Sequence, residues 1–183
     1  MKAVAVALCA AACGDVATPA FPLREQFTGR VAQSDVAVAV VRDGSQVVAY
    51  VCGGDATLES HTAWYQGEMQ GDRAVLRGAR GELSLAFERD AVRGAVGALA
   101  FRIERTSALG GLYEHRGACR TGVIVFGGGD GDFAAQGAGC DANGRRSQVT
   151  PIRPMELLAD GLAVVVDRDP TRTLFVRPVS IGR

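Results

Sequence analysis

The chain has 183 residues, of which 48% are apolar and 22% are charged, and its formal net charge is zero. This length and composition allow the chain to bury a core and exclude wholesale disorder. The balanced charge argues against a nucleic-acid binder, because such proteins carry an excess of basic side chains that neutralises phosphates.

The first twelve residues have the features of an export signal. Lys2 is followed by an uninterrupted run of apolar and small residues from Ala3 to Cys13, which is typical of the charged and apolar regions of a secretory signal peptide. The run is too short for a permanent transmembrane helix, which needs about 20 apolar residues. We therefore predict a signal peptide over residues 1–12 and an exported protein.

The residues before Cys13 resemble the lipobox of bacterial lipoproteins, in which small residues fit the signal peptidase and the cysteine thiol receives a lipid. Ala10-Ala11-Ala12 precedes Cys13, although Ala10 stands where lipoboxes carry leucine. The resemblance implies lipidation of Cys13 and contact with the cell membrane through that lipid anchor only. Cleavage after Ala12 would also suit plain secretion to the periplasm or medium. A mis-assigned start codon and a cytosolic protein with an apolar terminus are further alternatives.

Residues 13–27 are predicted to form a tether and residues 28–183 a single all-β domain. The tether contains two of the six prolines of the chain. The domain opens with the apolar runs 36–41 and 46–52, which flank Asp43-Gly44. Asp-Gly between two β-branched runs is the strongest short-range signal for a β-hairpin, because both turn positions need a positive φ.

The middle of the chain continues this pattern with further short segments. Predicted strands follow one another at residues 63–70, 73–78, 82–88, 92–97 and 98–105. Within two of them, apolar residues alternate with more polar ones. Because successive side chains of a strand point to opposite faces, we expect one buried inner face formed by Leu83, Leu85, Phe87, Leu99, Phe101 and Ile103.

The last section is less regular. Strands are predicted at residues 111–116 and 120–126, followed by a glycine-rich loop at 127–132 and a segment at 133–140, and a final hairpin pairs residues 162–167 with 173–179. The one helix expected is a short one over residues 154–159, where Pro154 can open a helix and Gly161 can close it.

The spacing of these turns, about every 8–12 residues, is typical of a β-meander and does not suit βαβ units. The predicted fold class is all-β, either an antiparallel up-and-down barrel or a strongly curved meander of about 8–12 strands with a lipocalin- or avidin-like architecture. A two-sheet sandwich is the alternative.

The cysteines agree with export. After Cys9 of the signal and Cys13 of the lipobox are set aside, Cys52, Cys119 and Cys140 remain, and none forms a C-x-x-C pair. A disulfide between Cys119 and Cys140 is predicted, because they flank one strand–loop–strand unit and an oxidising compartment favours the bond. Cys52 ends an apolar strand and is expected to be a buried thiol, although three cysteines allow three pairings.

No motif for a metal, a cofactor or catalysis emerges. The 127–132 loop matches neither a calcium-binding nor a phosphate-binding pattern, and His61 and His115 lack metal ligands at the required spacing. Trp64 and Tyr65 are candidate ligand-binding residues, because aromatic side chains at a barrel mouth often contact ligands. The alternative is that Trp64 fills the core and Tyr65 faces outward.

Residues 34–106 also resemble uncharacterised exported proteins and lipoproteins of high-GC bacteria. The likeness rests on SDVAVAVVRDGSQVVAYVCGG, AWYQGEMQGDR and GELSLAFERDAVRGAVG, that is, a hairpin with an Asp-Gly turn, a strand ending in Y-x-C, an aromatic–Gly strand and a closing meander. It implies a β-meander and carries no activity or site residue.

We expect a non-catalytic exported lipoprotein or secreted binding module of the bacterial cell envelope. Its partner would be a small molecule or a protein, and neither a cofactor nor nucleic acid. A secreted hydrolase with a site assembled from loops is the alternative. Acidic, His and Ser side chains converging in one pocket would favour the hydrolase, whereas an apolar cavity or an exposed sheet edge would favour binding.

Overall fold

The computed structural model describes residues 24–106, 110–127, 133–152 and 161–181. The predicted signal peptide, the lipidation site Cys13, the predicted helix at 154–159 and most of the 127–132 loop lie outside the described residues. The described chain is almost entirely β-structure, which confirms the all-β class. No helix in these ranges is long and apolar enough to cross a membrane.

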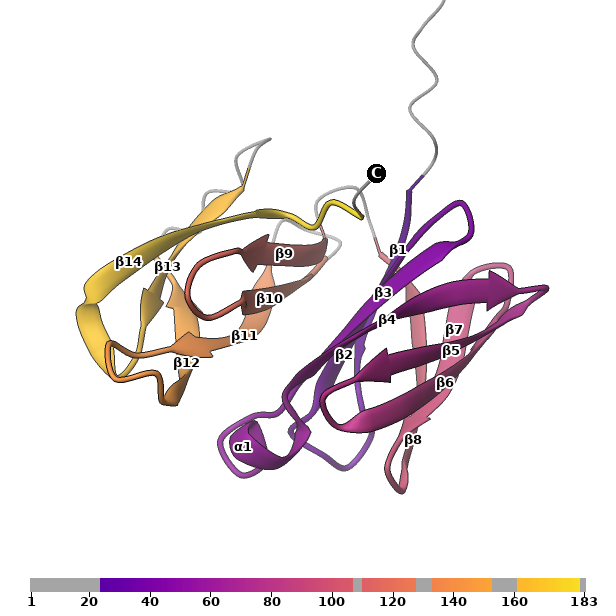
Figure 1. The fold of residues 1–183 in the computed structure, drawn as a ribbon, viewed down its shortest axis with the longest axis horizontal. Coiled ribbons are helices and arrows are strands. Elements are labelled where there is room, and N and C mark those ends of the chain that lie inside the picture. Colours follow the sequence, from indigo (N-terminus) through magenta and orange to yellow (C-terminus); the bar gives the residue numbers. More distant parts are fainter. Residues whose placement is uncertain (1–23, 107–109, 128–132, 153–160, 182–183) are drawn as a thin grey trace, which may run out of the picture.

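The strands form two closed antiparallel barrels that lie side by side (Figure 1). The first barrel contains eight strands in sequence order. They are β1 Glu25–Arg30, β2 Ala37–Asp43, β3 Gln46–Cys52, β4 Ala63–Gln70, β5 Arg73–Gly78, β6 Gly81–Phe87, β7 Ala91–Val96 and β8 Leu99–Arg105. The barrel closes where β8 pairs with β1. A single-turn helix, α1 (Leu58–His61), lies between β3 and β4.

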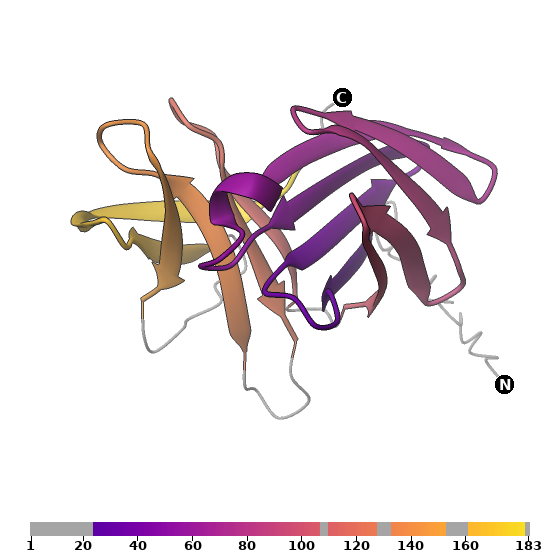
Figure 2. The ribbon, with the colours of Figure 1, turned by 90° about the horizontal axis from the view of Figure 1, so that it is seen from below.

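The second barrel follows after a short connection and has six described strands. They are β9 Gly111–His115, β10 Thr121–Phe126, β11 Ala134–Cys140, β12 Arg146–Pro151, β13 Leu162–Val166 and β14 Asp169–Pro178. It closes where β14 pairs with β9. Both barrels are therefore up-and-down, and Figure 2 shows them from below.

The barrel architecture is the predicted one, but the strands close into two barrels and not into one sheet of about 8–12 strands. The connection between them, residues 106–110, is no longer than a hairpin loop, so nothing in its length marks a boundary. Strands β1 and β12 lie where no strand was predicted, and β1 begins at Glu25, inside the predicted tether. That residues 28–183 behave as one domain stays a prediction.

The alternation in the meander gives the expected inner face. Leu83, Leu85, Phe101 and Ile103 belong to the buried core of the first barrel, and Phe87 and Leu99 pack against it while partly buried. Gly94 on β7 makes room for this core, because a Cβ atom there would lie 2.6 Å from the ring of Phe101. The prediction for this face is confirmed.

The second barrel has its own core, formed by inward side chains of all six strands. Val123 and Val125 of β10 point into it, while Gly122, Ile124 and Phe126 lie on the other face of the strand. Residues of that other face belong to a third apolar cluster, which lies between the barrels and includes side chains from both. The candidate functional site lies where the two barrels meet.

Candidate functional site

Strands β2 and β3 are buried on both faces. One face points into the first barrel, and the other carries small and apolar residues toward the second barrel: Ala37, Ala39, Val41, Val48, Tyr50 and Cys52. The alternating valine and alanine of β2 explain this, because valines fill the interior while alanines leave space for an approaching strand. The continuous apolar run at 36–41 is the sequence signature of burial on two faces.

A buried glutamine of the second barrel ties the two barrels together. Gln136 on β11 donates through Nε2 to the carbonyl oxygens of Asp35 (2.8 Å) and Cys52 (2.9 Å), and its Oε1 accepts from Arg30 Nη1 at 2.7 Å. Only 9% of the residue is exposed. All three contacts are with the first barrel, so this one side chain fixes the relative position of β11 and β3.

A partly open pocket of about 480 Å³ lies between the barrels. Residues of the first barrel and of the α1–β4 segment form one wall, and β11, β12 and the loop before β10 form the other. The described residues that line it are Tyr50, Thr62, Ala63, Trp64, Ala79, Arg80, Cys119, Arg120, Ala138, Gly139, Cys140 and Arg146. We treat this inter-barrel pocket as the candidate functional site.

Two aromatic rings and a guanidinium group form a stack at the pocket. The rings of Tyr50 and Trp64 lie 4.5 Å apart between centroids. The guanidinium carbon of Arg120 lies 3.6 Å from the centre of the Trp64 ring. Gly122 allows this close approach, since a Cβ atom there would lie 2.6 Å from Tyr50 and 2.8 Å from Trp64. The stack is therefore held from both barrels.

Trp64 also carries an unsatisfied donor. Its indole Nε1 is buried and has no hydrogen-bond partner among the described residues. A buried polar group without a partner costs about 1–3 kcal/mol, and native proteins keep few of them. A residue of the pocket wall thus carries a buried N–H group that is not paired with any of the described residues.

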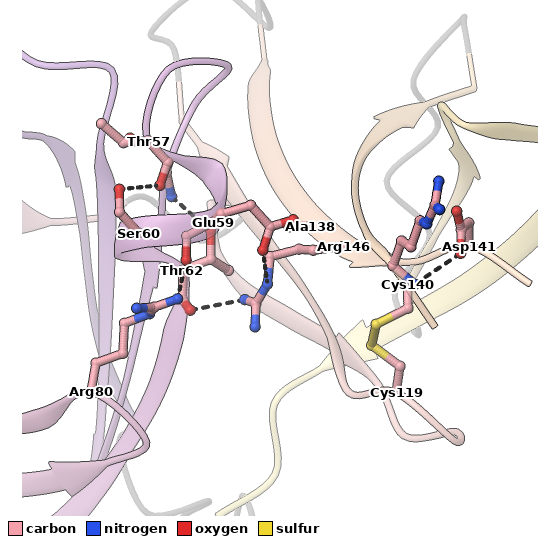
Figure 3. Close-up of polar contacts among 12 residues, drawn as sticks. Thr57, Glu59, Ser60, Thr62, Arg80, Cys119, Ala138, Cys140, Asp141 and Arg146 are labelled. Carbon is pink, nitrogen blue, oxygen red and sulfur yellow. Dashed lines mark hydrogen bonds and ion pairs between the residues drawn. A yellow bond between two sulfur atoms is a disulfide. The ribbon is translucent and has the colours of Figure 1, made fainter. Parts of the chain in front are cut away.

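Two further arginines reach the pocket from opposite sides (Figure 3). Arg80, in the turn between β5 and β6, donates to the carbonyl oxygen of Glu59. Arg146 on β12 donates through Nη1 to the carbonyl oxygen of Thr62 at 2.8 Å. Both guanidinium groups are thereby oriented by the same α1–β4 segment.

The buried hydroxyl and thiol beside the pocket stay protonated at neutral pH. Burial raises the pKa of the Tyr50 hydroxyl well above its ordinary value. Burial also raises the pKa of the Cys52 thiol to about 11. Since the thiolate is the reactive form of cysteine, Cys52 is not activated as a nucleophile here. It is a free, buried thiol, as the sequence predicts.

The structure separates the two aromatic residues that the sequence analysis groups together. Trp64 lines the inter-barrel pocket, whereas Tyr65 is 4% exposed and belongs to the core of the first barrel. They are neighbours on β4, so they must point to opposite faces of the strand. This is the reverse of the alternative in which Trp64 fills the barrel core and Tyr65 faces outward.

Cys119 and Cys140 form a disulfide in the structure, which is the predicted pair. The bond joins the loop before β10 to the end of β11, and both cysteines line the pocket. Arg120 follows Cys119 directly in the chain. The disulfide therefore restrains the segment that carries the stacked guanidinium group.

Sequence reasoning missed Tyr50, Arg80, Arg120 and Arg146 as members of a site. They are far apart in sequence and come together only when the barrels pack. The sequence offered two local signals for a site, since Arg120 directly follows Cys119 and Tyr50 precedes Cys52 by two residues. Neither signal indicates a pocket without the packing of the barrels.

Two other cavities deserve comparison. One, of about 400 Å³, contains Arg30, Asp35, Asp55 and Asp167 among its lining residues. Its Asp35 accepts from Thr57 Oγ1 at 2.5 Å, and this hydrogen bond lowers the pKa of that carboxyl group. Asp35 is thus used within the protein. Within the described ranges, no group of His, Cys, Asp or Glu residues is arranged to hold a metal ion.

The other cavity, of about 340 Å³, lies at the end of the first barrel and contains Ser60, His61 and Glu82. The Oγ atom of Ser60 lies 2.8 Å from Nδ1 of His61. Tyr65 lines this cavity as well, so each of the two predicted aromatic residues lines a different cavity.

Comparisons of the chain with protein-family models, with curated proteins and with solved structures find no match.

Proposed function

We propose that this chain is a non-catalytic binding module of the bacterial cell envelope, exported as a lipoprotein or as a secreted protein, and that it holds a small ligand in the inter-barrel pocket. The observation that carries the proposal is the pocket itself. It combines an aromatic stack with fixed hydrogen-bond donors between two closed barrels, and ligand sites typically combine apolar walls with a few oriented polar groups.

The pocket is also held in shape before any ligand arrives. The disulfide, the Gln136 contacts and the hydrogen bonds of Arg80 and Arg146 fix its two walls. A site whose donors are already oriented loses less entropy when a ligand binds. This favours a function in which binding is the task.

Export is supported by two independent features. Lys2 is followed by an apolar run that ends in Ala-Ala-Ala-Cys, and the Cys119–Cys140 disulfide is a bond that persists in oxidising compartments. Lipid attachment at Cys13 would hold the barrels at the membrane surface on the tether that precedes β1.

Two experiments test this proposal. Intact-mass analysis of the protein from its native host should show loss of residues 1–12 and, on Cys13, added acyl mass. A soluble chain that still begins at Met1 would overturn the export part. A fragment screen followed by Trp64 fluorescence should yield ligands of the pocket, and a screen without a single fluorescence-active ligand would overturn the binding part.

A secreted hydrolase is the second candidate, because Ser60, His61 and Glu82 share one cavity and the serine hydroxyl lies within hydrogen-bond distance of the histidine ring. The Ser60 hydroxyl also donates to the carbonyl oxygen of Thr57 at 3.2 Å, and it would become an activated nucleophile where its proton passes to the neighbouring histidine base instead. Labelling with a fluorophosphonate probe decides between the candidates. Labelling that disappears in Ser60→Ala would favour the hydrolase, and an unlabelled protein would count against it.

A further inference from the structure

The charge of the inter-barrel pocket points to the class of ligand. The charged residues that line it within the described chain are Arg80, Arg120 and Arg146, and none of the described lining residues is acidic. The chain as a whole has equal numbers of acidic and basic residues. Three guanidinium groups around one cavity are therefore a local excess of positive charge in a neutral protein.

Arg120 is the best neutralised of the three. Its Nε and Nη2 atoms both lie 2.8 Å from Oε2 of Glu114. Glu114 is 6% exposed and is shared with Arg116, whose Nη2 atom lies 2.9 Å from Oε1. One carboxylate thus serves two guanidinium groups, and Arg120 is held rigidly against Trp64.

The positive charges of Arg80 and Arg146 are less compensated by acidic side chains. In the described part of the chain, Arg80 donates to a backbone carbonyl, which carries no formal charge. Arg146 likewise donates to a carbonyl, and its contact with the Glu59 carboxylate is 3.9 Å long, with that side chain 71% exposed. An exposed ion pair of this length contributes little, so among the described residues no carboxylate compensates either charge closely.

We propose that the inter-barrel pocket binds a small organic anion, with its carboxylate or phosphate group facing Arg80 and Arg146 and its apolar part beside Trp64. The inference rests on the proposed function, since it names the ligand class of the same pocket. Guanidinium groups present several N–H donors in one plane and match both kinds of oxyanion. The aromatic wall supplies contact area for a ring or a short apolar chain.

The single tryptophan of the chain makes the test direct. Trp64 fluorescence is followed while the folded, disulfide-bonded protein is titrated with benzoate and phenyl phosphate, and with their neutral counterparts benzyl alcohol and phenol. We expect saturable changes with at least one anion, and much weaker ones with the neutral compounds. The two anions distinguish a carboxylate site from a phosphate site. Calorimetry repeats each titration without relying on fluorescence.

Variants locate the interaction. Arg80→Gln and Arg146→Gln should each weaken anion binding by about tenfold, because a charge-assisted hydrogen bond is lost. Arg73→Gln, at an exposed arginine on β5 that lines none of the described cavities, should leave binding unchanged. Circular dichroism verifies that all three variants are folded.

Three outcomes would overturn the inference. Neutral compounds could bind as well as the anions, the two pocket variants could bind like Arg73→Gln, or neither anion could bind. The proposed function has its own test, because a fragment screen that yields neutral ligands of the Trp64 pocket would leave it standing while the anion inference fails. A screen that yields no ligand would instead remove both.

Discussion

Replacement of Gln136 by alanine tests how the two barrels are joined. The substitution removes two donations to carbonyl oxygens of the first barrel, at 2.8 Å and 2.9 Å, and one acceptor for Arg30 at 2.7 Å. Each neutral hydrogen bond contributes about 0.5–1.5 kcal/mol to stability, and one to a charged group about 1.5–3 kcal/mol. Gln136 borders a cavity, so water can replace part of the Arg30 contact. We therefore expect a loss of about 2–4 kcal/mol.

Urea denaturation followed by circular dichroism measures this loss. Gln70→Ala is the matched control, because Gln70 is an exposed residue at the end of β4 and its truncation should change stability by less than about 0.5 kcal/mol. If Gln136→Ala were as stable as Gln70→Ala, the reasoning would be refuted, and the apolar cluster together with contacts such as the Arg146–Thr62 hydrogen bond would be what holds the barrels together.

Three further predictions concern stability. Phe101→Ala should cost about 3–5 kcal/mol through a cavity in the first barrel, whereas Arg102→Ala on the exposed face should cost less than about 0.5 kcal/mol; equal melting points would contradict the strand register. Loss of the Cys119–Cys140 bond, which closes a loop with a sequence separation of 21, should cost about 3 kcal/mol in denaturation under reducing conditions. The pKa of the Cys52 thiol is raised from 9.0 to about 11, so its neutral form is favoured in the folded state. The contribution of the protonated Cys52 thiol to folding stability is therefore fully present below pH 9 and is lost as the pH rises through 11. Between these two pH values, the free energy of unfolding of the wild type should fall relative to that of Cys52→Ala, as measured by urea denaturation.

The class of fold could be predicted because strand signals are local. A hairpin joins β2 and β3 as predicted, although its two turn residues are Gly44 and Ser45, because Asp43 still pairs with Gln46 at the end of β2. The segments 63–70 and 73–78 coincide with β4 and β5. Period-2 alternation placed Leu83 and Ile103 in the same core because each strand turns one face inward. These inferences need only neighbouring residues.

The division into two barrels could not be predicted in this way. The run at residues 36–41 indicates burial on both faces, but it does not tell what covers the outer face. That cover is β9 to β11 of the second barrel, strands that span residues 111–140 and so are distant from this run in the sequence. Strand β12, in contrast, was missed because it has no apolar run: its two buried residues are Ser147 and Val149, and they alternate with polar ones.

The candidate site was predictable only in part, for the same reason. Trp64 was found because a lone tryptophan on a strand is conspicuous, and the alternation rule implied that it and Tyr65 face different ways. Which of the two lies inside depends on the position of the barrel axis, and this comes from the whole sheet. The arginines that give the pocket its charge belong to turns and strands of different barrels.

The pocket exists only where the two barrels are packed against each other, because residues of both barrels line it. Without the second barrel, the outer faces of β2 and β3, including Val41, Val48 and Tyr50, would be open to water, and an apolar face of this kind marks a surface that requires a partner. The second barrel has the matching face in Ile124 and Phe126. Since each barrel covers apolar surface of the other, opening the interface costs hydrophobic free energy. The walls of the pocket are therefore held in place by the same burial that joins the barrels, and a ligand that binds there stabilises their association.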